Sequence, residues 1–216
     1  MPVHLPAYPV NLVVDGRRVL VVGGGAVAAS KARGLLEAGA VVHVVGREVG
    51  DAVRALAVTW EERPYAAGEV AGYRLAVACT DDPSVNQAVF DDAEAAGVWI
   101  NAADDPERCS YTLPARLDRG HLLITVSTSG HSPAFSSWLR DQLAQVIGPD
   151  HETLLRLLTE ARAELAVQGT SRPAADWRQA LDSGMLDLIR SGRVAEAREV
   201  LHTSLRLGAP PSLESR

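Results

Sequence analysis

The sequence predicts an α/β fold: a Rossmann-like parallel sheet domain, then a small β/α segment, then an all-helical C-terminal domain. Three observations support this prediction. Short apolar runs rich in β-branched residues alternate with helical patterns from Arg18 to Ala102, as in parallel strands covered on both faces. A run of glycines joins the first strand to the first helix, and only helical patterns follow Asp150. We therefore expect domains at residues 1–113, 114–149 and 150–216.

The first elements form a strand, turn, helix and strand of the lengths that a nucleotide-binding unit needs. Val19 to Val22 reads as a short buried strand that ends at Gly23-Gly24-Gly25. The helix that follows carries an apolar stripe, and Gly39 is its expected stop. Val41 to Val45 returns as the second strand.

The spacing Gly23-x-Gly25-x-x-Ala28 satisfies the dinucleotide-binding fingerprint in its Gly/Ala form. Gly23 permits the tight turn, Gly25 lets a pyrophosphate approach the backbone, and Ala28 lets the helix and strand pack closely. The N–H groups at the start of the helix point at the anion. The candidate cofactor-binding residues of this turn are Gly23, Gly24, Gly25, Ala26 and Val27.

One expected feature is missing after the second strand. An acid there would bind the adenosine ribose, whereas this chain has Gly46-Arg47-Glu48. Arg47 is a candidate for stacking on the adenine or for meeting a 2′-phosphate, and Glu48 is a candidate for the ribose. A solvated Arg47 without a ligand is an equally good interpretation. The sequence therefore leaves NAD and NADP both open.

Two further strands continue the α/β pattern. Arg74 to Cys79 and Val98 to Ala102 read as buried strands, with a helix from Pro83 to Ala96 between them. Ligands of doubly wound sheets bind beyond the carboxyl ends of the strands. Thr80 and Asp104 follow such ends. Thr80 is therefore a candidate for contact with the dinucleotide, although a role in the turn alone explains it equally well.

The second half of the chain changes character. Arg116 to His121 reads as a turn and Leu122 to Ser127 as a strand, followed by a polar loop. A helix from Ala134 to Val146 begins after Ser132, which is a good N-cap. Three more helices are expected: His151 to Val167, Ala174 to Arg190, and Val194 to Leu207.

Composition argues against several classes of protein. The formal net charge of -6 disfavours a general nucleic-acid binder, because such binders present a basic face to phosphates. No apolar run is long enough to span a bilayer, and the first residues lack the pattern of a signal peptide. The two cysteines form no CxxC motif, so we expect a cytoplasmic protein with reduced thiols. The scattered histidines indicate no resident metal site.

Four patterns stand in order along the chain: GGGAVAASKARGLLEAGA, ACTDDPSVNQAV, NAADDPERCSYTLPA and TVSTSGHSPAFSSWLR. Together they resemble the precorrin-2 dehydrogenase/sirohydrochlorin ferrochelatase family, which includes the N-terminal module of siroheme synthases. The resemblance covers residues 9 to about 145. It implies an NAD-dependent oxidation of the tetrapyrrole precorrin-2 to sirohydrochlorin, in siroheme or cobalamin biosynthesis. In some members it also implies insertion of ferrous iron or cobalt, with the metal as a substrate.

The resemblance further implies how the chain is organised and assembled. It implies an NAD-binding domain at residues 1–113, a dimerisation segment at 114–149, and a homodimer without nucleic-acid or membrane partners. The fused methyltransferase domain of some relatives would not fit in the residues that remain. Methylation is therefore not expected of this chain.

The same resemblance implies the site residues. Asp104 matches the acid that the family places in its active site after N-x-x-D, where a carboxylate is a suitable base for the proton released by dehydrogenation. Asp105, followed by Pro106, is expected to cap the turn. Capping of the helix and ordinary surface ion pairs are alternative roles for the residues proposed to bind the carboxylates of precorrin-2. Those candidate substrate-binding residues are Ser127, Ser129, His131, Arg116 and Arg119.

Two alternatives belong to other classes. A nucleotide-sensing module of a potassium transport system also pairs a glycine-rich turn with a downstream threonine, acid and asparagine. Such modules usually carry an acid after the second strand and lack the TVSTSGHSP segment. A short-chain reductase needs a tyrosine four residues before a lysine, and the single lysine, Lys31, has no such tyrosine.

Overall fold

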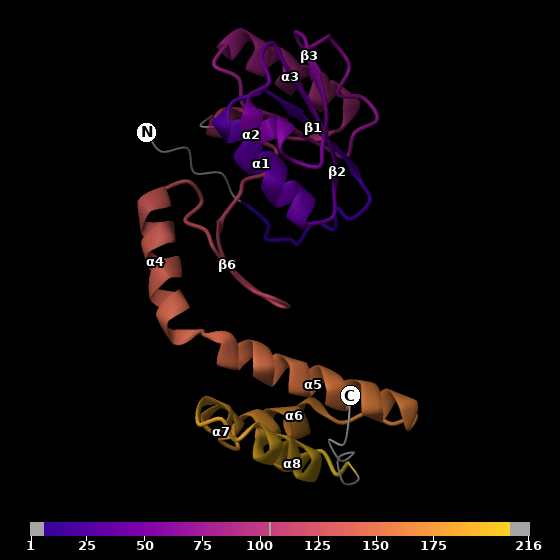
Figure 1. Cartoon of the computed structure of the whole chain (residues 1–216), viewed down its shortest axis with the longest axis vertical. Coiled ribbons are helices and arrows are strands. Elements are labelled where there is room, and N and C mark those ends of the chain that lie inside the picture. The colour runs from indigo at the N-terminus through magenta and orange to yellow at the C-terminus, as the bar shows by residue number, and fades with distance from the viewer. Residues whose placement is uncertain (1–6, 104, 208–216) are drawn as a thin grey trace. The chain divides into compact units, whose positions relative to one another are not determined.

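The structure, a computed structural model, describes residues 7–103 and 105–207 (Figure 1). The chain divides into two compact units. The first runs to Leu113 and includes Ser129–His131, and the second comprises Pro114–Thr128 and the chain from Ser132 onward. Each unit has its own buried hydrophobic core.

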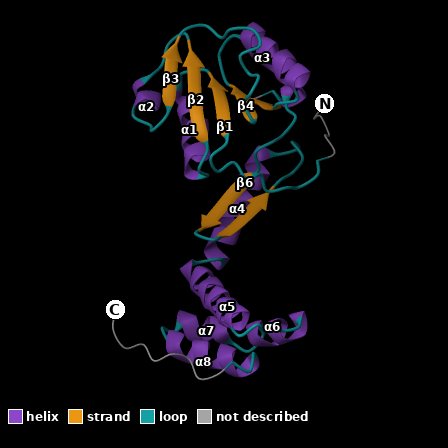
Figure 2. Ribbon diagram, turned by 90° about the vertical axis from the view of Figure 1, so that its right-hand side faces the viewer, coloured by secondary structure: helices purple, strands orange, loops and turns teal. Residues whose placement is uncertain are grey.

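A five-stranded parallel sheet forms the centre of the first unit, with the strand order β3-β2-β1-β4-β5 (Figure 2). The helices α1 and α3 cover opposite faces of this sheet, because Val19 and Val21 pack with α1 whereas Leu20 and Val22 pack with α3. This confirms the predicted Rossmann-like parallel sheet. The elements are β1 (Arg18–Val22), α1 (Ala26–Glu37), β2 (Val41–Gly46), α2 (Asp51–Arg54), β3 (Thr59–Glu62), β4 (Leu75–Ala78), α3 (Pro83–Ala96), β5 (Trp99–Ala102) and the short 3-10 helix η1 (Pro106–Arg108).

The strand order reverses at β1. The chain runs from β1 to β2 and β3 on one side of it and then returns to β4 and β5 on the other side. The connections after β1 and β4 therefore leave the sheet in opposite directions, and ligands of doubly wound sheets bind at such a switch point. The glycine turn at residues 23–25 follows β1 at this point.

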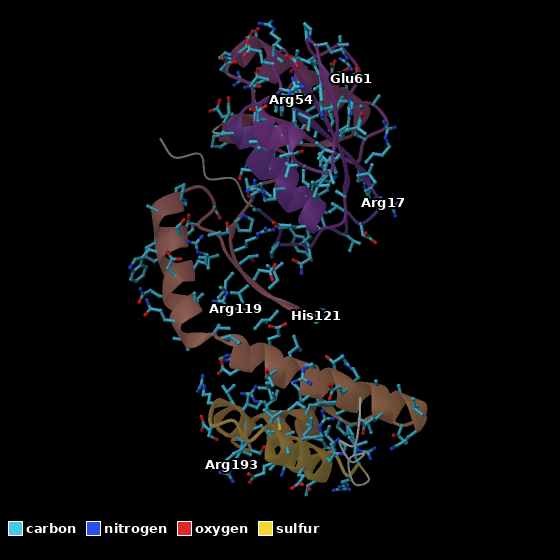
Figure 3. All side chains as sticks on the ribbon, viewed as in Figure 1. Arg17, Arg54, Glu61, Arg119, His121 and Arg193 are labelled. Atoms are coloured by element: carbon cyan, nitrogen blue, oxygen red, sulfur yellow. The ribbon has the colours of Figure 1, made fainter. Side chains whose placement is uncertain are left out.

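Two short elements, α2 and β3, are present that the sequence pattern does not predict. All four residues of β3 are exposed, so this edge strand shows no alternation of buried and exposed positions. Charged side chains surround this strand: the Arg54 guanidinium lies 4.2 Å from the centre of the Trp60 ring, and Arg63 donates to Glu61. Figure 3 labels Arg54 and Glu61. A charged edge of this kind discourages pairing with a further strand.

The second unit begins with an antiparallel hairpin of β6 (Ala115–Arg119) and β7 (Leu122–Val126). The prediction that Arg116 to His121 forms a turn is therefore wrong. Only Gly120 and His121 connect the strands, with Gly120 at φ +63°; Figure 3 labels Arg119 and His121 on this hairpin. Leu117 is the single buried residue of β6, and the charged residues around it hide the strand pattern.

Helices form the rest of the second unit: α4 (Pro133–Val146), α5 (Pro149–Val167), α6 (Ala174–Leu181), α7 (Met185–Arg190) and α8 (Val194–Ser204). The single helix predicted over Ala174 to Arg190 is wrong. It breaks between α6 and α7, where Gly184 adopts φ +83°. Buried apolar residues of α5, α7 and α8, among them Leu157, Met185 and Leu201, form one core. Among the described residues, no helix is both long and apolar enough to cross a membrane.

Candidate functional site

Gly23 and Gly24 are required by the packing around the end of β1. Gly23 has φ +128°, and a Cβ atom there would lie 2.6 Å from the carbonyl oxygen of Cys79. A Cβ on Gly24 would lie 1.9 Å from the carbonyl oxygen of Glu48, and the Gly24 carbonyl accepts a hydrogen bond from Gly50 N–H at 3.0 Å. These two glycines therefore let the turn pack against the segments that follow β4 and β2.

Gly25 differs from its neighbours because open space, and not protein, faces it. A Cβ on Gly25 would meet nothing within 4 Å, and its φ of −83° suits any residue. As the N-cap of α1 it offers no side-chain acceptor to the first turn of the helix. The N–H groups at this helix start are therefore available to an anion, as the pyrophosphate of a dinucleotide requires. The turn fits such a group.

Arg47 and Glu48 are both exposed at the end of β2. The Arg47 side chain reaches Asp82, which follows β4, with 3.7 Å between Nη2 and Oδ2. Asp82 is itself held in place, because its other oxygen accepts hydrogen bonds from the N–H and hydroxyl of Ser84 as the N-cap of α3. These hydrogen bonds keep the pKa of Asp82 below its ordinary value.

Thr80 takes part in the turn that follows β4. Its hydroxyl lies 2.8 Å from Asn86 Oδ1 and 3.0 Å from the Asp82 carbonyl oxygen. The Asn86 amide also donates to the Thr80 carbonyl at 3.0 Å. These bonds account for Thr80 as a turn residue, and its contact with a cofactor stays a prediction. The role of Asn86 was not predicted, although ACTDDPSVNQAV contains it.

The expected catalytic acid, Asp104, lies outside the described residues. Its neighbours are anchored at the carboxyl edge of the sheet: Ala103 N–H donates to the Ala78 carbonyl at 2.8 Å, and Asp105 N–H to the Ala102 carbonyl at 3.3 Å. Asp105 is the N-cap of η1 and accepts from Glu107 N–H, which confirms its predicted role in the turn.

The segment after η1 folds back along β5. The buried Asn101 donates its side-chain amide to the Tyr111 carbonyl at 3.0 Å, and the Ser110 hydroxyl oxygen accepts from Ile100 N–H at 2.8 Å. The sequence analysis assigns no role to these residues. Asn101 within the apolar strand could have indicated this fold-back, because a buried side-chain amide needs hydrogen-bond partners.

Neither cysteine is suited to act as a nucleophile. Burial raises the pKa of the Cys79 thiol to about 12. Burial also raises the pKa of Cys109, whose sulfur lies 3.3 Å from the Ala102 carbonyl oxygen. The thiolate is the reactive form of cysteine, so both side chains stay unreactive near neutral pH.

The five candidate substrate-binding residues fall in different units. Ser129 and His131 belong to the first unit, whereas Arg116, Arg119 and Ser127 belong to the second. Ser129 has φ +51°, an uncommon backbone conformation for serine. Arg119 donates from Nε to the Ile147 carbonyl at 3.2 Å and so caps the end of α4. A common binding site for the five residues stays a prediction.

The start of α4 is built as predicted, with Ser132 as its N-cap. The Ser132 hydroxyl oxygen accepts a hydrogen bond from Phe135 N–H at 3.2 Å. Thr128 accepts from Ser132 N–H, and its hydroxyl lies 3.1 Å from that of the buried Ser136. Within residues 7–103 and 105–207, no group of three or more His, Cys, Asp or Glu side chains is placed to hold a metal ion.

Two sequence families match the chain. Residues 10–115 match the family described as "Putative NAD(P)-binding". Residues 119–145 match the family described as "Sirohaem biosynthesis protein central". The first match covers the parallel sheet with its glycine turn, and the second covers most of the hairpin and α4.

Curated relatives align with almost the whole chain. The siroheme synthase of Azotobacter vinelandii is 35% identical over 216 residues, which cover 97% of this chain and 46% of that protein. The siroheme synthase of Chromobacterium violaceum is 35% identical over 207 residues, which cover 93% of this chain and 44% of that protein. The chain thus spans a little less than half the length of these relatives.

A solved structure named "SirC, precorrin-2 dehydrogenase" has the same fold. It superposes with a TM-score of 0.72 and covers 93% of this chain and 100% of that chain. The two sequences are 23% identical, so the likeness concerns the fold.

Proposed function

Because this chain belongs to the precorrin-2 dehydrogenase/sirohydrochlorin ferrochelatase family, which includes a module of siroheme synthases, we propose that it oxidises precorrin-2 to sirohydrochlorin with NAD as the acceptor. The relatives are about twice as long, so the proposal concerns only the activity of the shared part. A nucleotide-sensing module of potassium transport is not favoured by these relatives.

The open glycine turn is the observation that carries the proposal. Gly25 leaves space in front of α1, and the first N–H groups of that helix lack a side-chain acceptor. Ala26 and Val27 begin this helix and are the proposed donors to the pyrophosphate. The nicotinamide of the bound cofactor supplies the acceptor for a hydride. A cytoplasmic location stays a prediction from the sequence.

Asp104 is the proposed base. Oxidation removes a hydride and a proton from precorrin-2, and the proton needs an acceptor close to the carbon that loses it. Ala103 and Asp105 flank Asp104 in the sequence and are hydrogen-bonded to the ends of β4 and β5. The family resemblance gives the base role to Asp104, whereas Asp105 caps η1 and pairs with Arg108.

Ser127, Ser129, His131, Arg116 and Arg119 remain the proposed partners of the substrate carboxylates. Precorrin-2 is a polyanion, and hydroxyl, imidazole and guanidinium groups bind carboxylates well. Arg119 also supports α4, so its substitution would affect the fold as well as binding. Insertion of ferrous iron or cobalt is kept as an expectation of the family resemblance, since no observation among the described residues favours it.

We further propose that residues 114–149 form the interface of a homodimer. Within this segment Phe135 and Trp138 of α4 are 50% and 55% exposed, and their ring centres lie 5.6 Å apart. Ser136 is the one buried residue of α4. Two exposed aromatic rings on one helix are typical of a protein–protein interface.

The proposed activity is tested with purified chain, precorrin-2 and NAD+, by following the absorbance of the tetrapyrrole and the formation of NADH. Turnover is expected for the wild type. Asp104→Ala is expected to lower kcat by about 100-fold or more, because general-base catalysis contributes that much. Its affinity for NAD+ should stay close to the wild-type value.

The matched control is Asp105→Asn, which changes the neighbouring acid and keeps a residue able to cap η1. Its kcat should stay within about threefold of the wild-type value. No turnover by the wild-type chain would reject the proposed activity, and full turnover by the Asp104 variant would reject the assigned base. Sirohydrochlorin mixed with ferrous or cobaltous ion tests metal insertion separately.

A further inference from the structure

The segments that follow β2 and β4 carry more negative than positive charge. Residues 47–50 and 79–83 contain Glu48, Asp81 and Asp82 but only one basic residue, Arg47. The Arg47 side chain is 68% exposed, and its guanidinium points to the carboxylate of Asp82. The single guanidinium of these segments is thus directed at a carboxylate of the protein.

This ion pair crosses the end of β1. In the sheet, β1 lies between β2 and β4, with Val45, Val22 and Ala78 at matching positions. A contact from the residue after β2 to a residue after β4 must therefore pass over the turn that follows β1. The adenosine half of a dinucleotide on this turn lies towards the end of β2.

Asp82 is the fixed member of the pair. One of its oxygens is occupied as the N-cap of α3, 3.0 Å from Ser84 N and 2.6 Å from Ser84 Oγ. The other oxygen faces Arg47. The carboxylate cannot move away without uncapping the helix, whereas the long arginine side chain can adopt many positions. Asp82 therefore decides where the guanidinium points.

We propose that the ion pair between Arg47 and Asp82 makes this site select a dinucleotide without a phosphate on its adenosine ribose. The inference rests on the proposed use of a nicotinamide dinucleotide and names the residues that determine which one is bound. A 2′-phosphate would have to compete with Asp82 for the guanidinium. It would also bring about two negative charges close to Asp82 and Glu48.

This mechanism differs from the usual one, in which an acid at the end of the second strand repels the 2′-phosphate directly. Here that position is an arginine, which by itself would favour NADP. The acid that reverses this preference is supplied by the start of α3. Removing its charge while keeping the cap should therefore release Arg47 and improve the binding of NADP.

Titration calorimetry with NAD+ and with NADP+, without substrate, tests the inference. The wild type should bind NAD+ more tightly. Asp82→Asn preserves the cap, since asparagine is as good an N-cap as aspartate. It should shift the ratio of the two dissociation constants towards NADP+ by about fivefold, the upper range for one exposed charge–charge contact. In the double variant R47A/D82N the ratio should return to within about twofold of the wild-type value, because the released guanidinium carries the gain.

Asp81→Asn is the matched control, since it removes the same charge from the neighbouring residue, which has no ion pair with Arg47 within 4.0 Å. Its ratio should change by less than about twofold. Equal affinity of the wild type for both dinucleotides, an unchanged ratio in Asp82→Asn, or an equal shift in Asp81→Asn overturns the inference and leaves the proposed function standing. A folded wild type that binds neither dinucleotide overturns both. Thermal unfolding of each variant confirms that it is folded.

Discussion

The three glycines after β1 illustrate how one residue type serves two purposes. Gly23 and Gly24 are fixed by backbone atoms of neighbouring segments, so a side chain at either position would collide with protein. Gly25 faces open space and has a φ that suits any residue. Its lack of a side chain therefore has no structural cause in the described chain, and access of a ligand to the helix start explains it.

Gly25→Asp should raise stability and lower cofactor binding at the same time. An aspartate fits the open space and would cap α1, which should add about 0.5–1 kcal/mol to the free energy of unfolding. Its carboxylate would occupy the place of the pyrophosphate, so the affinity for NAD+ should fall by at least about 30-fold. Thermal unfolding and titration calorimetry measure the two effects.

The control for this substitution is Gly23→Ala, which should be destabilising because of the positive φ and the contact with Cys79. A Gly25→Asp variant that binds NAD+ as well as the wild type would show that the helix start is not the pyrophosphate site. A variant that is more stable but binds NAD+ more weakly indicates a ligand-binding glycine. Substitution of a glycine with a structural role would lower the stability.

Residues of the candidate site could be predicted from the sequence where local spacing determines them. The glycine turn, the cap at Ser132 and the capping role of Asp105 depend on a few neighbouring residues. The pairing of Arg47 with Asp82 could not be predicted, because it depends on the order in which β2, β1 and β4 lie in the sheet. The orientation of each side chain is a tertiary property.

At the scale of elements, the sequence predicts those that have a buried stripe. The strands β1, β2 and β4 are almost entirely buried and were found from their apolar runs. The two strands that were missed or misplaced, β3 and β6, bury none of their residues and one residue, respectively. Hydrophobic patterning reports burial, so an element that buries little leaves almost no signal.

The ion pair between α5 and α7 should make the helical part of the chain sensitive to acid. Arg190 donates from Nε to Asp150 Oδ2 at 2.8 Å. Burial, the largest single influence, opposes ionisation of this carboxyl, but the hydrogen bond from Arg190, a backbone hydrogen bond and the contact with His151 together outweigh it and lower the pKa of Asp150 below its ordinary value of 3.8. A carboxyl with a lowered pKa in the folded state stabilises the fold above its ordinary pKa. That stability is lost as the pH falls through the lowered value.

Asp150→Asn should therefore be less stable than the wild type at pH 7, and the difference should shrink as the pH falls below the ordinary pKa of aspartate. Urea unfolding followed by helical circular dichroism at several pH values measures this. Asp187→Asn is the control, because Asp187 lies farther from the same arginine, at 3.6 Å, and its side chain is 85% exposed. A constant difference across the pH range for Asp150→Asn would exclude the proposed role of its charge.

At the scale of the whole molecule, each unit closes its own core, and the exposed apolar residues of α4 belong to neither core. Phe135 and Trp138 lie one helical turn apart, and Val146 at the end of the same helix is 65% exposed. The sequence of α4 places apolar residues, among them Phe135, Trp138 and Val146, on a helical period. It could not show whether the same chain or another covers that face, because periodicity is identical in both cases.

Trp138→Glu should convert the proposed dimer into monomers. A charge at the centre of an apolar interface cannot be solvated there, and a buried tryptophan commonly contributes about 2 kcal/mol or more to association. Sedimentation velocity at several protein concentrations should therefore show a dissociation constant at least about 30-fold weaker than that of the wild type. Val167→Glu is the matched control, because Val167 is 91% exposed on α5, outside the proposed interface. A Trp138→Glu variant that is folded and dimeric would place the interface elsewhere, whereas a monomeric wild type would exclude the homodimer itself.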